Sequence, residues 1–328
     1  MMLSQLSPIL LFTVVGGLLC FPSSYASAQQ ESIDALRQLA LEQLGPDRLG
    51  AGYAALINFA VNPDISAATF YIDVDGADNP TLNVFRLPLR HVFKPTNHTW
   101  RPFVQANFAY QAFDASLDVL EGESIDLTYR TYGGSLTLGA EIPLGKNLVL
   151  LAAVDAGIIR LESDADYHGF IVNMFIKPAF DGLVFNWDAD AWILGASLGI
   201  DYRRTLYGFD FNVHSSLTHN YIETFDSSSG LIEFNSQVTT LVANAETVLP
   251  TRMSIATYPL AVVVNAGYTT FLGSDRDELG FTYFFEGGLS LEVDVSQKQW
   301  VLQNLRLGAK AIYGEDVTGW SLIFGYRF

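Results

Sequence analysis

The chain ends in GWSLIFGYRF (residues 319–328), in which apolar or aromatic residues occupy every second position. Successive side chains of a β-strand point to opposite faces, so this period of two predicts a strand with one strongly apolar face. The residues of that face are Trp320, Leu322, Phe324, Tyr326 and Phe328. An apolar face that continues to the last residue needs an apolar neighbour, which is either a second sheet or the hydrocarbon of a membrane.

The same period of two recurs along most of the chain. It predicts about twelve strands, near 317–328, 300–313, 280–295, 257–272, 233–249, 206–222, 189–202, 148–160, 128–142, 100–113, 81–93 and 67–75. The predicted connections alternate in character: short basic stretches such as PLGKN (143–147) alternate with longer acidic ones such as DASLDVLEGESID (114–126) and residues 161–188. Short turns at one end and long loops at the other are typical of an outer-membrane β-barrel.

The composition narrows the class of protein. Hydrophobic residues make up 49% of the 328 residues and charged residues only 16%, which is well below the share of about 25% in soluble domains. The 18 Lys and Arg residues against 35 Asp and Glu residues give a formal net charge of −17. Nucleic acid is therefore excluded as a partner, because binding its phosphates needs a basic surface.

The N-terminus has the pattern of a secretory signal peptide. An apolar stretch at residues 9–21 is followed by Ala26, Ser27 and Ala28, a small-x-small cleavage site, so residues 1–28 are predicted to be removed. The single cysteine, Cys20, lies in this segment, and the exported chain therefore needs no disulfide. Residues 29–50 are predicted to form a helical segment, either periplasmic or lumenal, and residues 51–328 the barrel.

Two all-β arrangements can bury alternating apolar faces: a soluble sandwich and a transmembrane antiparallel barrel. Trp and Tyr residues recur near the predicted strand ends, as in the aromatic belts at membrane interfaces. In hydrocarbon every backbone N–H and C=O group must be paired within the protein, so strands span a membrane only as a closed ring. Together with the export signal, these features favour a closed barrel of about twelve strands with a short N-terminal helix.

The face opposite the apolar one is predicted to line the lumen of this barrel. Its charged residues carry both signs, so they can pair across the lumen, and both an aqueous pore and a filled interior are left open. The sequence predicts no catalytic residue, metal or cofactor. The lumen-lining residues are Asp73, Arg86, Arg90, Arg101, Glu141, Asp155, Asp201, Asp210, His214, Glu286, Glu292, Arg306 and Lys310.

One stretch raises the alternative of an outer-membrane hydrolase. In VHSSLTHN (213–220), His214 and Ser216 share a strand face, which resembles the outer-membrane phospholipases. Those enzymes present their nucleophile to lipid, whereas here Val213 and Leu217 occupy the apolar face and His214 and Ser216 point inward. A hydrolase acting at the acidic extracellular rim is a further alternative.

The terminal strand resembles the C-terminal signature of bacterial outer-membrane proteins, which the barrel-assembly machinery reads. A short helix followed by about twelve strands resembles the solitary autotransporter-like barrels, a family with the barrel and no passenger. The resemblance implies insertion into the bacterial outer membrane by that machinery, with membrane lipid and lipopolysaccharide as surroundings. It implies a structural or pore-forming role, and a small-solute diffusion channel of porin type is the nearest alternative.

Overall fold

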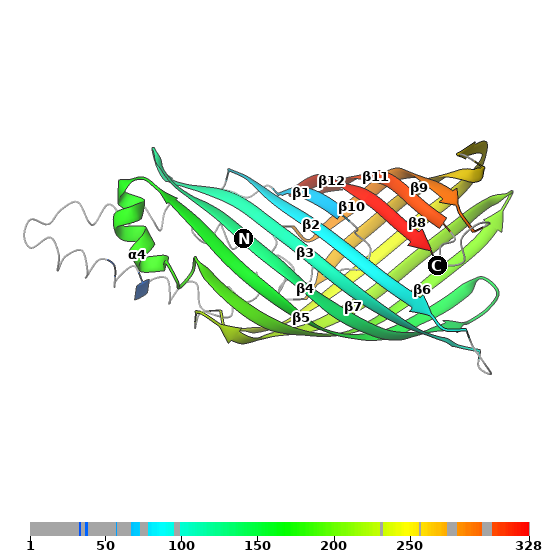
Figure 1. Ribbon diagram of the computed structural model, residues 1–328, viewed down its shortest axis with the longest axis horizontal. Helices are drawn as coiled ribbons and strands as arrows, with labels where there is room; N and C mark the ends of the chain where they lie inside the picture. The colour runs from blue at the N-terminus through cyan, green and yellow to red at the C-terminus, as the bar shows by residue number, and fades with distance from the viewer. Residues whose placement is uncertain are drawn as a thin grey trace, which may run out of the picture.

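The protein folds into a barrel of twelve antiparallel strands that closes on itself (Figure 1). The computed structural model describes residues 33, 37–38, 57, 67–72, 78–94, 99–229, 232–255, 257–273, 281–296 and 304–327. The prediction of an all-β transmembrane barrel of about twelve strands is confirmed. Within the described residues, no helix is long and apolar enough to cross a membrane.

The strands follow one another around the ring in sequence order. They are β1 (Ala67–Ile72), β2 (Asp78–Val92), β3 (Arg101–Leu120), β4 (Glu123–Pro143), β5 (Leu148–His168), β6 (Trp187–Leu206), β7 (Phe209–Ser227), β8 (Asn235–Ile255), β9 (Tyr258–Leu272), β10 (Tyr283–Asp294), β11 (Asn304–Gly314) and β12 (Val317–Arg327). Between β5 and β6 lie two short helices, η1 (Val172–Ile176) and α4 (Lys177–Phe180).

The ring closes where the first strand meets the last. Ala67 of β1 pairs with Leu322 of β12 on one side and with Phe85 of β2 on the other. Since each strand has a hydrogen-bonded neighbour on both sides, the described strands leave no open edge. We call the end at which β12 finishes the C-terminal end of the barrel, and the opposite end, which carries η1 and α4, the lid end (Figure 1).

The prediction of a long loop at residues 114–126 is wrong. These residues continue β3 and β4, and the chain reverses at Glu121 and Gly122. Gly122 has a φ of +79°, a left-handed conformation that suits glycine in a tight turn. The predicted loop at 161–188 is likewise shorter, because β5 runs to His168 and β6 begins at Trp187.

Toward the lid end, the long strands carry their apolar residues on the inner face of the barrel. In β4 the outward residues Leu136 and Leu138 are exposed and apolar, whereas nearer the lid end Ile125 and Leu127 are apolar and buried inside. No register shift interrupts the pairing of β4 with β5, so the apolar residues move from one face of the strand to the other. The barrel therefore faces hydrocarbon along one part of its length and has a water-facing exterior with a packed apolar interior beyond it.

Leu289 lies near the middle of β10 and is 60% exposed on the outer face of the barrel. A substitution at this position tests whether that face contacts lipid. We expect Leu289→Arg to lower the free energy of folding into lipid vesicles by about 2–4 kcal/mol, because a mid-membrane arginine must leave water. Denaturant titration of vesicle-inserted protein measures it, with Leu289→Phe as the control that stays near wild type. Equal stability of the two variants would show that Leu289 does not face lipid.

Candidate functional site: the barrel interior

At the lid end the barrel interior is filled by a cluster of buried apolar side chains. Phe70, Leu82 and Phe284 from the wall are fully buried in it. Two helical residues outside the wall, Ile33 and Ile57, belong to the same cluster, and Ile57 has no exposed surface. The interior at this end is therefore dry, and side chains from the N-terminal part of the chain help to fill it.

The segment between β5 and β6 adds a second layer to this cluster. We call residues 169–186 the lid. Its side chains Val172, Ile176 and Val184 are buried among those of the wall. Side-chain hydrogen bonds attach the lid to its neighbours. Among them, Ser229 Oγ donates to Leu183 O at 2.8 Å, and Asn186 Oδ1 accepts from Ala165 N at 2.7 Å.

Glu123, at the tip of the β3–β4 hairpin, accepts hydrogen bonds from the first backbone N–H groups of the lid. Its carboxylate oxygens lie 2.9 Å from Phe170 N, 3.2 Å from Ile171 N and 2.9 Å from Val172 N. Gly169 precedes them with a φ of +100°, and a Cβ there would collide with the Glu123 carboxylate. These N–H groups have no partner within the helix, so the carboxylate satisfies donors that would otherwise be orphaned.

Nearer the C-terminal end the inner face is polar and its charges are paired. Glu141 accepts from both Arg90 and Arg101, each at 2.7 Å. The Arg90 guanidinium also lies 3.9 Å from the centre of the Phe103 ring. Arg90, Arg101 and Glu141 belong to the consecutive strands β2, β3 and β4. These ion pairs therefore connect neighbouring strands of the barrel wall.

A second network joins four strands. Arg306 of β11 lies 2.5 Å from Glu246 of β8 and 2.6 Å from Glu292 of β10. The Arg306 side chain is largely buried, with 15% of its surface exposed. Asn212 of β7 donates to Glu246 at 3.0 Å. Farther along β11, Lys310 lies 3.4 Å from Glu286. Glu246 was not among the predicted lumen residues, although it alternates with Ala245 and Thr247 and could have been found by the same period of two.

The remaining predicted residues lie in different surroundings. Arg86 is buried and acts electrostatically on Asp155, while His214 Nδ1 lies 2.5 Å from Asp201. Asp210 is exposed beside the β6–β7 turn, where Thr205 donates to it at 2.6 Å. Asp73 lies outside the described residues. The structure therefore brings the predicted charges together in separate wall networks, with Asp210 at the rim.

The structure describes both His214 and Ser216 of the hydrolase alternative. Ser216 lies on the same strand face and is buried, but its Oγ has no hydrogen-bond partner among the described residues. A serine nucleophile is activated by a hydrogen bond to its base. The Asp201–His214 pair therefore does not extend to Ser216.

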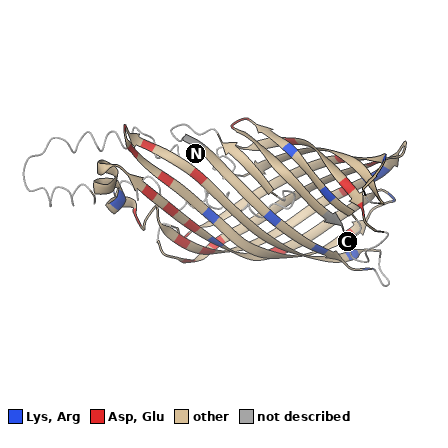
Figure 2. Cartoon of the chain, turned by 45° about the horizontal axis from the view of Figure 1, so that its top comes forward, with Lys and Arg blue, Asp and Glu red and all other residues tan. Residues whose placement is uncertain are grey.

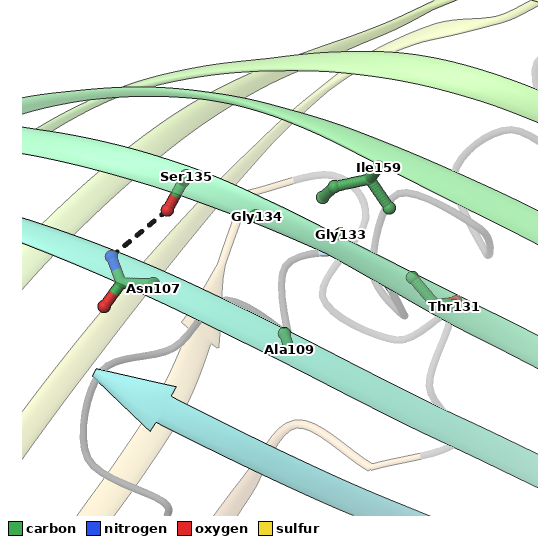
Figure 3. A pocket seen from close by; sticks show the side chains of 7 residues that line it. All are labelled: Asn107, Ala109, Thr131, Gly133, Gly134, Ser135 and Ile159. Carbon is green, nitrogen blue, oxygen red and sulfur yellow. Dashed lines mark hydrogen bonds between the residues drawn. The ribbon is translucent and has the colours of Figure 1, made fainter. Parts of the chain in front are cut away.

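One small cavity opens on the inner face over β3, β4 and β5 (Figure 3). Asn107 and Ser135 point toward each other at one side of it, with 3.1 Å between Asn107 Nδ2 and Ser135 Oγ, and Ile159 lies at the other side. Its volume of about 10 Å³ is close to the space that one water molecule needs. Nowhere in the described part of the chain do three or more His, Cys, Asp or Glu residues gather in a way that could hold a metal ion.

The C-terminal strand presents its apolar face outward. Trp320, Leu322 and Phe324 of β12 are exposed, and Ser321 between them is buried. Tyr326 pairs with Leu305 through the backbone, but its side chain and the whole of Phe328 lie outside the described part of the structure. A hydrophobic outer band on a closed ring of strands defines a transmembrane β-barrel of the outer-membrane type.

Comparison with known proteins gives the family. The model of the solitary outer membrane autotransporter β-barrel domain matches residues 77–328, so the chain belongs to this family and is a barrel of the bacterial outer membrane. The fold is similar to the translocator domain of autotransporter NalP from Neisseria meningitidis, with a TM-score of 0.53 and 13% identity over 84% of this chain and 93% of that one.

A second solved structure shares the fold. The transport unit of the autotransporter AIDA-I from Escherichia coli has a TM-score of 0.50 and 12% identity over 86% of this chain and 99% of that one. No curated protein sequence matches the chain. The predicted membership of the solitary autotransporter-like barrels is confirmed, and the chain is an autotransporter-type barrel.

The Arg306 network can be tested by removing its cation. We expect Arg306→Leu to lower the free energy of unfolding by about 3 kcal/mol, because the carboxylates of Glu246 and Glu292 lose the cation that compensates their charge in the interior. Adding Glu246→Gln and Glu292→Gln to that variant should recover most of the loss, since the uncompensated charges are gone. Denaturant unfolding followed by tryptophan fluorescence measures both, and an unchanged midpoint in Arg306→Leu would contradict the pairing.

The attachment of the lid should depend on pH. Glu123 lies beyond the apolar outer band, and the N–H groups of Val172, Ile171 and Phe170 hold the pKa of its carboxyl below the ordinary value. A depressed folded-state pKa stabilises the folded form above the unfolded-state pKa, and the contribution is lost as pH falls through the folded-state pKa. The protection factors of amides 170–172, which are their exchange rates corrected for the intrinsic effect of pH, should therefore be high at neutral pH and fall in acid.

The matched control for this pH dependence is Glu123→Gln, which cannot ionise. Its lid amides should have lower protection factors than those of the wild type at neutral pH, and these factors should change little on acidification. Equal exchange in the two proteins at neutral pH would rule out the carboxylate as the group that holds the lid.

Proposed function

We propose that this chain is a closed outer-membrane barrel with a structural role, and that it does not conduct solutes. The observation that carries the proposal is the apolar cluster that fills the lid end, to which Ile33 and Ile57 contribute. An ion or sugar that crossed this cluster would have to give up its hydration without receiving equivalent partners, which costs several kcal/mol or more. A cluster of this kind acts as a seal.

The polar half of the interior supports the same reading. Porin lumens hold water between charges, whereas here Arg90, Arg101 and Arg306 are each held by a carboxylate in the wall. Charges that pair along the wall stabilise neighbouring strands and leave little net field to select a solute. We infer that these residues serve the stability of the barrel.

In this proposal, the described residues between 29 and 50 contribute to the seal. The helical residues that the structure describes there are Ile33, which is buried, and Arg37 and Gln38, which are exposed. A helix with one buried and one exposed side is amphipathic, and its apolar side suits the dry end of the barrel. The chain thereby closes its own lumen, and a role in catalysis is not part of the proposal.

The partners follow from the surface. The exposed residues Trp320, Leu322 and Phe324 support recognition of β12 by the barrel-assembly machinery during insertion. The acidic exterior beyond the apolar band would meet the lipopolysaccharide of the outer leaflet. Export through the cleavable signal at residues 1–28 precedes both steps in this proposal.

Planar bilayer conductance tests the closed lumen. We expect the wild type to show no discrete openings, whereas Ile33→Asp should show them, because a carboxylate placed in the apolar cluster is expelled into water. Arg37→Gln lowers the charge by the same amount at an exposed helical position and should stay closed. Frequent openings in the wild type would support the porin-like channel and overturn the proposal.

A further inference from the structure

The exposed cations at the C-terminal end of the barrel include Lys94, Lys146, Arg204 and Arg252. Each belongs to one of the connections β2–β3, β4–β5, β6–β7 and β8–β9 or to the strand end beside it. None of the four forms an ion pair with another residue that the structure describes. Among the residues that the structure describes, no carboxylate therefore lies within ion-pair distance of these four cations.

The lid end has the opposite character. Its outward arginines are paired, Arg130 with Asp164, and Arg160 with Asp188 at 2.7 Å and with Glu162 at 3.2 Å. Further acidic residues on the same exterior remain in excess of these cations. Figure 2 shows acidic residues gathered toward the lid end and basic residues toward the end at which the chain finishes. The barrel is thus electrically asymmetric along its axis.

Two of the unpaired cations come from segments that lie side by side. The backbone N–H of Arg203 donates to Asn147 O at 2.8 Å, which joins the end of β6 to the β4–β5 turn. Lys146 and Arg204 are the chain neighbours of these two residues. The backbone geometry therefore brings a lysine and an arginine to one place on the rim.

From this part of the rim toward the middle of the barrel, the outer surface is apolar. Arg204 is paired across the ladder with Phe211, and its outward neighbour Tyr202 is paired with Leu148. Toward the middle of the membrane the same face continues with Ile200 and Leu198, both exposed. Basic residues above an aromatic collar and an aliphatic wall match the order of groups in a phospholipid, with its phosphate at the interface and its acyl chains beneath.

We propose that Lys146 and Arg204 bind the phosphate of an anionic phospholipid in the leaflet that surrounds the C-terminal end, with its acyl chains against the face of Leu198 and Ile200. An anionic headgroup of the phosphatidylglycerol type fits because it keeps a net charge of −1 for the two cations, whereas the amine of a zwitterionic lipid cancels the charge of its phosphate. The inference concerns the outside of the barrel and does not depend on whether the lumen is closed.

The test measures which lipid stays with the protein. The full exported chain is purified from mixed micelles of detergent with equal amounts of phosphatidylglycerol and phosphatidylcholine, and the retained lipids are counted by native mass spectrometry. The wild type should retain phosphatidylglycerol in preference. Lys146→Gln and Arg204→Gln should each lower that preference about fivefold, because a basic residue near the headgroups attracts an anionic lipid by about 1 kcal/mol.

Lys177→Gln is the matched control. Lys177 is an exposed lid-end cation that lies over the Tyr167 ring at 5.4 Å, and its loss changes the net charge by the same amount. It should keep the wild-type preference, and the charge-conserving double variant Lys146→Arg with Arg204→Lys should keep it as well. Retention of phosphatidylglycerol by both glutamine variants, or an equal loss in Lys177→Gln, would overturn the proposal.

Two competitors identify the source of the phosphate. Inorganic phosphate added to the same micelles should displace little phosphatidylglycerol, because it lacks acyl chains to contact the barrel wall. Lipopolysaccharide should compete less well at this end than phosphatidylglycerol does. Complete displacement by inorganic phosphate would show a free-anion site, and complete displacement by lipopolysaccharide would show that the rim does not distinguish the two leaflets; either result would overturn the assignment.

Discussion

The structure depends on the closure of its backbone hydrogen bonds between β1 and β12. In hydrocarbon an unpaired N–H or C=O group costs several kcal/mol, so a sheet with two open edges cannot stay in a membrane. β1 has only six residues, yet it pairs with both β12 and β2 and so joins the two ends of the sheet. In the closed ring, successive side chains of each strand point alternately to the interior and to the exterior of the barrel.

Along the longest strands the apolar residues point outward in one half and inward in the other. Near the C-terminal end Leu138 points to lipid, and near the lid end Ile125 points to the interior of the same strand β4. The change needs no bulge, because moving the apolar residues from even to odd positions is enough. Burial of about 25 cal/mol per Å² of apolar surface then drives both halves, one against acyl chains and one against the lid.

The sequence was sufficient to predict the strands, since each alternates over many residues. The same alternation continues through Ala115, Leu117 and Ile125, but the acidic residues among them led to the interpretation of a loop. The interior pairs were less accessible to prediction. Arg306 reaches Glu246 from three strands away, and such a contact depends on barrel curvature, which no pattern within one strand reports. Asp210 was placed inside by parity, although it lies beside a turn where parity no longer fixes the surroundings.

The charges show how the surroundings of each region determine whether an ion needs a partner in the protein. Inside the wall, neither bulk water nor lipid headgroups can compensate Arg306, and it is held by two carboxylates. On the lid-end exterior, Arg130 and Arg160 lie among excess acids and pair with them. At the C-terminal end Lys146 and Arg204 have no such partner among the described residues, and in our proposal the phosphate of a phospholipid takes that place. An ion can remain unpaired in a folded protein at little cost only where its solvent completes the pairing, and in this barrel that solvent is the headgroup layer.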